Sequence, residues 1–405
     1  MNERALAGTK VLELCDTVAG SYCCKLLADM GAEVVKVERP TVGSKVRSRG
    51  PYPGDVPHKE KSALFLYLNT NKLGITLDAG RTSGAELLKE LARRVDILAE
   101  DTKPGTMKKL GLDYQSLAMV NPRLIMTSVT PFGQSGPYSK YRAYDLNVYH
   151  SGGDAYLLPS GLAWELYPNR EPLKGGGYLG EYQAGINAAV ATLAALYARD
   201  SFDEGQRVDV SMQESLIALN RRDMARYPNE GVVESRATGI FPVGGLYECK
   251  DGFVEISLLE DHEWQGLVDV MGNPEWAADP KYKERAGRYG DAAKLQPLIR
   301  QWMRQHTKEE VYRGAQAKGC AAGKVSTPEE VVKSKHLEAR GFFLDAEHAE
   351  AGKLKYPSVP ANFSETPFCI ERTAPLLGEH NEKIFFEWLN LDRQELVKLA
   401  RAGII

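Results

Sequence analysis

One carboxylate stands in a setting that could support covalent chemistry. Glu181 follows the glycine run 175–177 and precedes an alanine-rich stretch that continues to Arg199. Small residues in that stretch recur at helical spacing: Ala184, Ala188, Ala191 and Ala195. The spacing predicts a closely packed helix with the acid in its first turn. There the carboxylate faces unpaired N–H groups and the positive end of the helix dipole, so we expect it to be ionised and to serve as a helix cap or as a nucleophile.

The other residues that bind metals or act as nucleophiles have no comparable setting. The seven histidines are scattered along the chain. The six cysteines show neither Cys-x-x-Cys nor cysteine/histidine ligand spacing: Cys15, Cys23, Cys24, Cys249, Cys320 and Cys369. This pattern favours buried free thiols in a reducing compartment. We therefore expect no zinc or other metal site.

Composition and charge narrow the class of protein. The 405 residues are 43% hydrophobic and 26% charged, which is ordinary for a globular chain long enough for two domains. A net charge of −3 argues against general affinity for nucleic acid or acidic membranes. The apolar runs are too short to span a membrane, and the start MNERALAGTK lacks a signal pattern. We expect a cytoplasmic protein.

The elements that would position Glu181 have an alternating α/β pattern. Lys10–Leu14 and Ala32–Val37 have the pattern of buried strands, and Val18–Met30 between them is typical of a helix. After the alanine-rich helix, residues 208–212 alternate as in a further strand. This order predicts a doubly wound, Rossmann-like α/β domain. The turn after the first strand lacks G-x-G-x-x-G, so the dinucleotide fingerprint is absent.

The segment around Glu181 resembles the family III CoA-transferases, the formyl-CoA and carnitine CoA-transferase group. Two stretches carry the resemblance, LGEYQAG at Glu181 and DEGQRVDVSM after it. Further matching stretches are LADMGAEVVKVERPTVG, NTNKLGITLD, AEDTKPGTMKKLGLDY, NPRLIMTSVTPFGQSGPY and YRAYDLNVY, with the C-terminal segment from PEEVVKSKHLEARGFF onward. In that family the first motif carries an aspartate nucleophile, and its position falls on Glu181.

The resemblance implies an enzyme that moves CoA from an acyl-CoA, such as succinyl-CoA, to a small carboxylic acid. The family's route runs through an anhydride and a thioester of the enzyme carboxylate, and it needs no metal or covalently bound cofactor. The resemblance also implies a set of CoA-binding residues: Val18, Ala19, Arg39, Asn71, Lys72, Asp101, Thr102, Lys103, Lys109, Arg142 and Asp145. The cations among them suit the phosphates of CoA. Asp101 and Thr102 replace the family's more usual asparagine and aromatic pair.

Glu181 departs from the family pattern at the reacting residue. Its side chain is one methylene longer than aspartate, which moves the carboxylate by about 1–1.5 Å, and an error of about 1 Å can cost on the order of 10²-fold in rate. We favour a non-catalytic subunit paired with a homologous catalytic chain, as in two-subunit members such as benzylsuccinate CoA-transferase. The alternative is an active homodimer that uses Glu181. The family's glycine-rich lid corresponds here to ATGIFPVGG, which has less glycine.

Two further functions belong to other classes. An α-methylacyl-CoA racemase shares the fold, and its acid/base pair includes a histidine before the aspartate. Tyr144 and Asp145 stand at those positions, and His150 lies six residues beyond Tyr144. A structural or regulatory CoA-binding protein would keep the CoA motifs without turnover.

The domain organisation follows from pattern and resemblance together. We expect a large CoA-binding domain over residues 1–220, a linker over 221–240, a small α/β domain over 241–330 and a return to the large domain over 331–405. In the small domain we expect a hairpin of Leu246–Cys249 and Phe253–Leu258, followed by three helices: Asp261–Met271, Ala293–Gln305 and Lys308–Lys318. The resemblance implies two chains interlocked as a dimer.

Overall fold

The computed structural model describes residues 4–219, 221–237 and 242–405. The chain divides into two compact units. The first combines residues 1–153, 175–221 and 335–405, and the second combines 154–174 and 222–334. Within the expected linker, helix α10 (Arg221–Glu230) forms, and residues 238–240 lie outside the described part of the chain. The expected lid segment, ATGIFPVGG, includes residues 238–241, which are likewise not described.

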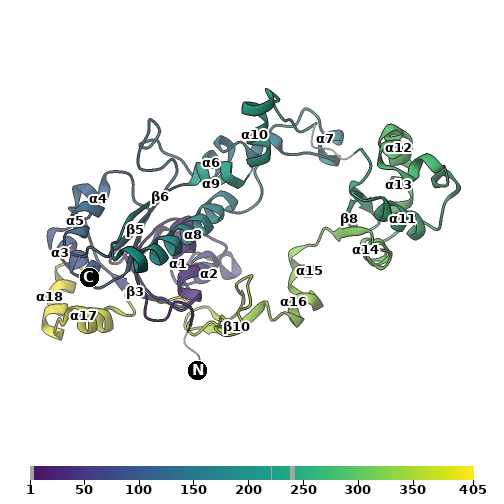
Figure 1. The fold of residues 1–405 in the computed structure, drawn as a ribbon. Helices are drawn as coiled ribbons and strands as arrows, with labels where there is room; N and C mark the ends of the chain where they lie inside the picture. The colour runs from purple at the N-terminus through teal and green to yellow at the C-terminus, as the bar shows by residue number, and fades with distance from the viewer. Residues whose placement is uncertain (1–3, 220, 238–241) are drawn as a thin grey trace. The chain divides into compact units, whose positions relative to one another are not determined.

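The first unit contains a six-stranded parallel sheet with the order β3-β2-β1-β4-β5-β6 (Figure 1). Its strands are β1 (Lys10–Leu14), β2 (Glu33–Glu38), β3 (Lys72–Thr76), β4 (Ile97–Glu100), β5 (Ile125–Thr130) and β6 (Arg207–Ser211). The order reverses direction between β1 and β4, which is where doubly wound folds bind their ligands. The prediction of a doubly wound α/β fold is confirmed. The strand predicted at 208–212 ends one residue early, because Met212 begins a helix.

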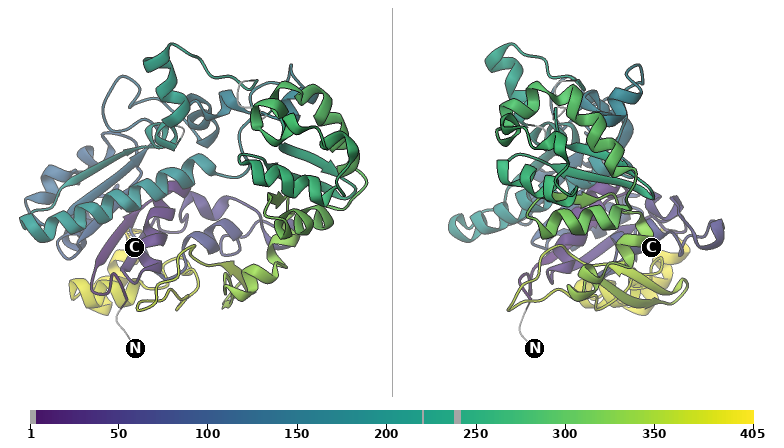
Figure 2. Two further views of the ribbon diagram at one scale, coloured as in Figure 1. Left: turned by 45° about the vertical axis from the view of Figure 1, so that its right-hand side comes forward. Right: turned by 90° about the vertical axis from the view of Figure 1, so that its right-hand side faces the viewer.

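Alternate residues of each strand face opposite sides of the sheet, and each side is covered by helices (Figure 2). On one side, Val11, Val34, Ile97 and Ile125 pack with α1 (Val18–Asp29) and α8 (Leu179–Phe202). On the other side, Leu12, Val35, Leu98 and Met126 pack with α3 (Thr82–Ala92), α5 (Tyr114–Ala118), α17 (Asn381–Leu389) and α18 (Arg393–Arg401). Residues 381–401 therefore complete the core of the first unit.

Helix α8 lies directly against α1, as its small residues predict. Ala184 and Ala188 are fully buried. At Gly185 even a methyl group would lie 2.7 Å from the Ala19 carbonyl oxygen, so this position requires glycine for the two helices to approach. The contact holds Glu181, at the start of α8, beside the start of α1.

The remaining elements of the first unit are short. They are 3₁₀ turns at Lys45–Ser48 and Pro53–Asp55, helices α2 (Ala63–Leu68), α4 (Thr106–Lys109), α6 (Asp145–Ser151), α9 (Met212–Leu219) and α16 (Lys335–Ala339), and a hairpin of β10 (Phe343–His348) and β11 (Gly352–Pro357). Among the residues described, no helix is both long and apolar enough to cross a bilayer.

The second unit has its own core around a three-stranded antiparallel sheet. The strands are β7 (Gly245–Cys249), β8 (Gly252–Ser257) and β9 (Ala321–Lys324). The helices around them are α7 (Leu162–Leu166), α11 (Asp261–Val270), α12 (Arg285–Gly290), α13 (Ala292–Met303), α14 (Lys308–Ala317) and α15 (Pro328–Val332). The predicted hairpin and the three predicted helices are confirmed to within two residues at each end. Strand β9 was not predicted.

Candidate active site

Glu181 lies in the first turn of α8, but its carboxylate is bound to a different helix. Its Oε2 accepts a hydrogen bond of 2.6 Å from the backbone N–H of Val18, the first residue of α1. The backbone N–H of Glu181 itself donates to Asp145 Oδ1 at 3.0 Å. The prediction that the carboxylate would face the start of its own helix is therefore wrong. The longer glutamate side chain carries the charge across to α1, whose positive end favours an anion.

The surroundings of Glu181 make it a weaker acid than free glutamate. The residue is only 6% exposed, and this burial raises the pKa of its carboxyl group. The Arg49 cation and the N–H groups of Val18 and Ala19 act in the opposite direction, and the Asp145 carboxylate adds to the increase. The sequence predicted an ionised carboxylate but gave no sign of the burial that raises its pKa. Val18 and Ala19, predicted to contact CoA, are fully buried and serve this carboxylate through their backbone.

A second carboxylate occupies the turn just before α1. Asp101 accepts hydrogen bonds from the N–H groups of Asp16 at 2.9 Å and Thr17 at 2.6 Å, and from Thr17 Oγ1 at 2.6 Å. Burial raises the pKa of Asp101 to about 7, although these donors lower it. In Rossmann folds the corresponding N–H groups hold a dinucleotide pyrophosphate. Here Asp101 and Glu181 take that place, which agrees with the missing glycine fingerprint.

Arg49 is a site residue that sequence reasoning missed. Its Nη1 lies 3.9 Å from Glu181 Oε1, and its Cζ lies 5.5 Å from the centre of the Tyr178 ring. Arg49 belongs to the loop after β2, which has no periodicity that could relate it to α8. The only signal was its place shortly after the family-like stretch that ends at Gly43. Arg39, which was predicted, is exposed at the carboxyl end of β2.

Two of the predicted CoA-binding residues are instead used inside the first unit. Lys72 is fully buried. Its Nζ forms an ion pair with Glu13 Oε2 at 2.7 Å and donates to the Ser21 carbonyl at 2.9 Å and to Asn69 Oδ1 at 3.0 Å. Because its charge is balanced inside the protein and its ammonium group is buried, we remove Lys72 from the phosphate-binding set.

Asn71 is likewise occupied by its own chain. Its Nδ2 donates to Asp29 Oδ1 at 3.1 Å and to the Cys369 carbonyl at 3.0 Å. Its Oδ1 accepts from the N–H of Glu371 at 2.8 Å. Asn71 therefore ties the segment 369–372 to the start of β3, and we assign it a structural role in place of the predicted contact with CoA.

The buried thiols lie next to the ion pairs of the sheet. Glu13, Cys15 and Cys24 place their ligand atoms within 4.8 Å of one another, an arrangement that their sequence spacing did not indicate. Glu13 already pairs with Lys36 Nζ and Lys72 Nζ, both at 2.7 Å. These two ammonium groups balance its charge, so we assign this cluster to the core. Five of the cysteines are buried as expected, whereas Cys369 is exposed.

A polar cavity of about 300 Å³ lies beside β4 and β5. Its lining includes Thr102 and Lys103, which were predicted, and Lys108, Gln134 and Arg207, which were not. Ser128 also lines the cavity; it is fully buried, and its hydroxyl has no hydrogen-bond partner among the described residues. Thr102 donates its N–H and its Oγ1 to Glu100 Oε2, at 2.7 and 2.6 Å. The predicted cations Lys109 and Arg142 are exposed and are not among the residues that line this cavity.

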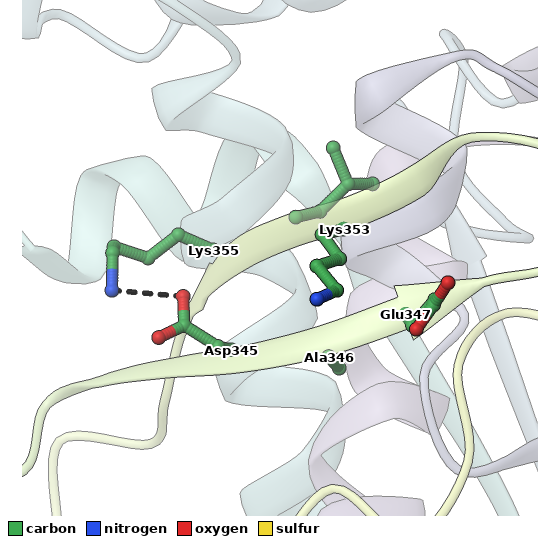
Figure 3. Close-up of a pocket in the computed structure, with 6 residues that line it drawn as sticks. Asp345, Ala346, Glu347, Lys353 and Lys355 are labelled. Atoms are coloured by element: carbon green, nitrogen blue, oxygen red, sulfur yellow. Dashed lines mark ion pairs between the residues drawn. The ribbon is translucent and has the colours of Figure 1, made fainter.

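A larger hollow, of about 580 Å³, lies open along the β10–β11 hairpin. Figure 3 shows its charged side chains on the two strands, with Lys355 Nζ paired to Asp345 Oδ1 at 2.9 Å. Glu347 and Lys353 lie opposite each other on the same face. The alternating charges are typical of a solvated hairpin face. We assign no chemistry to it.

His150 does not form a pair of catalytic acids or bases with Asp145. It is exposed on α6, and its Nδ1 lies 2.8 Å from the carbonyl of Leu146, one helical turn earlier. The residue before Asp145 is Tyr144, which is also exposed. This arrangement gives no support to racemase chemistry.

Comparisons with known proteins identify the family of the chain. The family model described as CoA-transferase family III matches residues 6–381. A succinyl-CoA–D-citramalate CoA-transferase of Chloroflexus aurantiacus is 33% identical over 406 residues, covering 99% of this chain and 98% of its own length. A succinyl-CoA–L-malate CoA-transferase beta subunit of the same bacterium is 30% identical, covering 99% and 98%. The crystal structure of a CAIB/BAIF family protein from Brucella suis matches with a TM-score of 0.84 at 29% identity, covering 96% and 100%.

Proposed function

The chain belongs to CoA-transferase family III, and from this membership we propose that it transfers CoA through Glu181. Family members move CoA between an acyl-CoA and a carboxylate, so CoA thioesters are substrates of this chain and not resident cofactors. We take succinyl-CoA as the donor because two relatives are named for it. One observation carries the proposal, namely the hydrogen bond from the Val18 N–H to Glu181 Oε2.

This hydrogen bond gives the two oxygens of Glu181 different roles. Oε1, on the side of Arg49, is the atom that attacks the acyl-CoA carbonyl. Oε2 becomes the carbonyl oxygen of the resulting anhydride and the oxyanion when the thiolate of CoA attacks Glu181 Cδ. The Val18 N–H is already in place at 2.6 Å to stabilise that oxyanion.

The proposed reaction then proceeds in four steps. Glu181 attacks the donor carbonyl, and CoA thiolate leaves as the mixed anhydride forms. The thiolate attacks Glu181 Cδ, which releases the donor acid and leaves a glutamyl-CoA thioester. The acceptor carboxylate attacks that thioester and again expels the thiolate. The thiolate finally attacks the acceptor carbonyl, giving the new acyl-CoA and the free Glu181 carboxylate. No proton transfer is required, because every nucleophile is an anion.

We assign the nucleotide part of CoA to the cavity beside β4 and β5. Lys103, Lys108 and Arg207 bring three cations to it, and the unpaired Ser128 hydroxyl adds a buried donor. Phosphates need such cations and donors. Arg39, Lys109 and Arg142 are exposed and can pair with the outer phosphates. We expect the double substitution K103Q/K108Q to raise the KM for succinyl-CoA at least about tenfold, because even one hydrogen bond to a charged group contributes about 1.5 kcal/mol. An unchanged KM would show that the nucleotide part of CoA does not bind in this cavity.

A second candidate is a non-catalytic subunit of a heteromer, interlocked with a homologous catalytic chain. The relative named as a beta subunit, which aligns over 99% of this chain, favours it. So does glutamate at the position of the family aspartate. In this case benzylsuccinate-type two-subunit enzymes are the appropriate comparison, and Glu181 acts as a cap on α1.

Activity of the purified chain alone separates the two candidates. The chain is incubated with succinyl-CoA and a series of free acids, and the acyl-CoA products are measured. We expect new acyl-CoA without any other protein, and none from E181Q. Turnover that starts only after a homologous subunit is added, and is the same with E181Q, would establish the second candidate.

A further inference from the structure

The guanidinium group of Arg49 has hydrogen-bonding capacity that the chain does not use. Its 3.9 Å separation from Glu181 is an ion pair without a hydrogen bond. Among the described residues, no other side chain or carbonyl accepts from this guanidinium. The group carries five N–H donors in a planar fork. Its side chain is only 27% exposed, so water can satisfy these donors only in part.

Arg49 is also held firmly in position. Its backbone N–H donates to the Val46 carbonyl at 3.1 Å, and its own carbonyl accepts from Ser62 Oγ at 2.5 Å. The Tyr178 ring packs beside the guanidinium, and a cation over an aromatic ring is stabilised there. A partly buried guanidinium on a fixed backbone, beside an aromatic ring, has less conformational freedom to lose when it binds a carboxylate.

The charge beside Arg49 changes during the proposed reaction. In the free enzyme the Glu181 carboxylate balances the arginine. Once Glu181 is an anhydride or a thioester, that oxygen no longer carries a negative charge. Arg49 is then a partly buried cation without a counter-ion, which is unfavourable. This state is the one in which an acid substrate must be bound within reach of Glu181 Cδ.

We propose that Arg49 binds the free carboxylate of the acid substrate whenever Glu181 is held as the CoA thioester. The substrate anion replaces Glu181 as the counter-ion of Arg49, and the guanidinium fork holds it beside the thioester carbon that it attacks. This inference rests on the proposed role of Glu181. It makes Arg49 the determinant of acid binding and leaves recognition of CoA to other residues.

The charge argument is tested by calorimetric binding of succinate. E181Q has the shape of Glu181 without its charge, as in the neutral thioester state. We therefore expect E181Q to bind succinate at least about tenfold more tightly than the unsubstituted chain, because one competing negative charge is removed. The double variant E181Q/R49Q should lose that gain, and E181Q/R49K should keep part of it. R93Q, which removes an exposed arginine just after α3, should bind as the unsubstituted chain does. Equal affinity in E181Q and E181Q/R49Q would overturn the proposal.

Kinetics of the two half-reactions provide a second readout. With succinyl-CoA alone, R49Q should still form its CoA adduct, whereas its KM for the acceptor acid should rise at least about tenfold with partial rescue in R49K. An R49Q variant that forms its CoA adduct and keeps an unchanged KM for the acid would contradict acid binding by Arg49. A variant that forms no adduct would contradict it too, because Arg49 would then act in the first half-reaction. The role of Glu181 is judged separately: a transferase-active E181Q would reject the nucleophile, while the calorimetric comparison would still decide on Arg49.

Discussion

Glu181 is carried by α8, whereas the hydrogen bond to its carboxylate comes from α1. An aspartate at this position would withdraw its carboxylate from the Val18 N–H by about 1.5 Å, one carbon–carbon bond. The additional methylene therefore brings the carboxylate to the donor. At the scale of single residues, the substitution is compatible with chemistry because the donor lies at the distance that glutamate reaches.

The raised pKa of Glu181 predicts the pH dependence of the first half-reaction. The reactive form is the carboxylate, so kcat/KM for succinyl-CoA should rise with pH through a pKa above the usual glutamate value of 4.5. In R49Q this rise should shift to still higher pH, because the cation that lowers the pKa of Glu181 is gone. R49K is the charge-retaining control and should stay close to the unsubstituted chain. A rise centred at or below the usual glutamate pKa would contradict the burial argument.

The buried charges at Glu13 predict a large effect on stability. Burial alone would raise the pKa of Glu13, but Lys36 and Lys72 outweigh it and lower that pKa. E13Q leaves two buried lysines without their carboxylate and should lower the free energy of unfolding by about 3–5 kcal/mol. Because the folded pKa is depressed, this contribution is present above the usual glutamate pKa and is lost as the pH falls through the folded value.

Urea unfolding at neutral pH measures the effect of E13Q directly. The matched control is E347Q, which removes an exposed carboxylate from β10 and should change the free energy of unfolding by at most about 0.5 kcal/mol. If E13Q and E347Q were equally stable, Lys72 would not depend on Glu13, and its removal from the phosphate-binding set would have to be reconsidered.

At the scale of elements, the sequence predicted strands and helices well but not which side chains they bury together. The alternation of β1, α1 and β2 was enough to predict a doubly wound fold. The role of Lys72 was not predictable in this way, because its pairing with Glu13 depends on the order β3-β2-β1. Arg49 was missed for a related reason, since a loop without periodicity brings it to Glu181. Local sequence patterns determine where strands and helices form, whereas the contacts within a site depend on how those strands and helices pack against one another.

The packing of α8 on α1 predicts an effect of a single methyl group. A Cβ at Gly185 would lie 2.7 Å from the Ala19 carbonyl and 3.1 Å from Tyr22 Cβ, so G185A must push the two helices apart. We expect a loss of about 1–3 kcal/mol in the free energy of unfolding, together with a lower kcat because the Val18 N–H moves away from Glu181.

G290A is the control for G185A, because Gly290 is also a helical glycine, the last residue of α12, but a Cβ there would meet nothing within 4 Å. Alanine there should leave stability unchanged or slightly raised. The stability of the two variants is compared by thermal unfolding, and their kcat values are compared by steady-state kinetics. A G185A variant that kept full stability and kcat would show that the start of α1 does not need to be fixed against α8.

At the scale of the whole molecule, the chain builds two units and places every residue of the proposed chemistry in the first. Glu181, Val18, Arg49 and the cavity beside β4 and β5 all belong to the unit that contains residues 1–153 and 175–221. Residues 154–174 interrupt this unit just before the glycine run and belong to the second. Composition could not indicate that residues 154–174 belong to the second unit, because the segment has no repeat or linker signature. The interlocked dimer remains a proposal drawn from the family.

The most direct test of the account is the mass of the peptide that contains Glu181 during turnover. The purified chain is mixed with succinyl-CoA, treated with hydroxylamine and digested. We predict a hydroxamate on Glu181 that forms only when succinyl-CoA is present and is absent from E181Q. A sample that produces new acyl-CoA while Glu181 stays unmodified would contradict the account and place the chemistry on another residue or another chain.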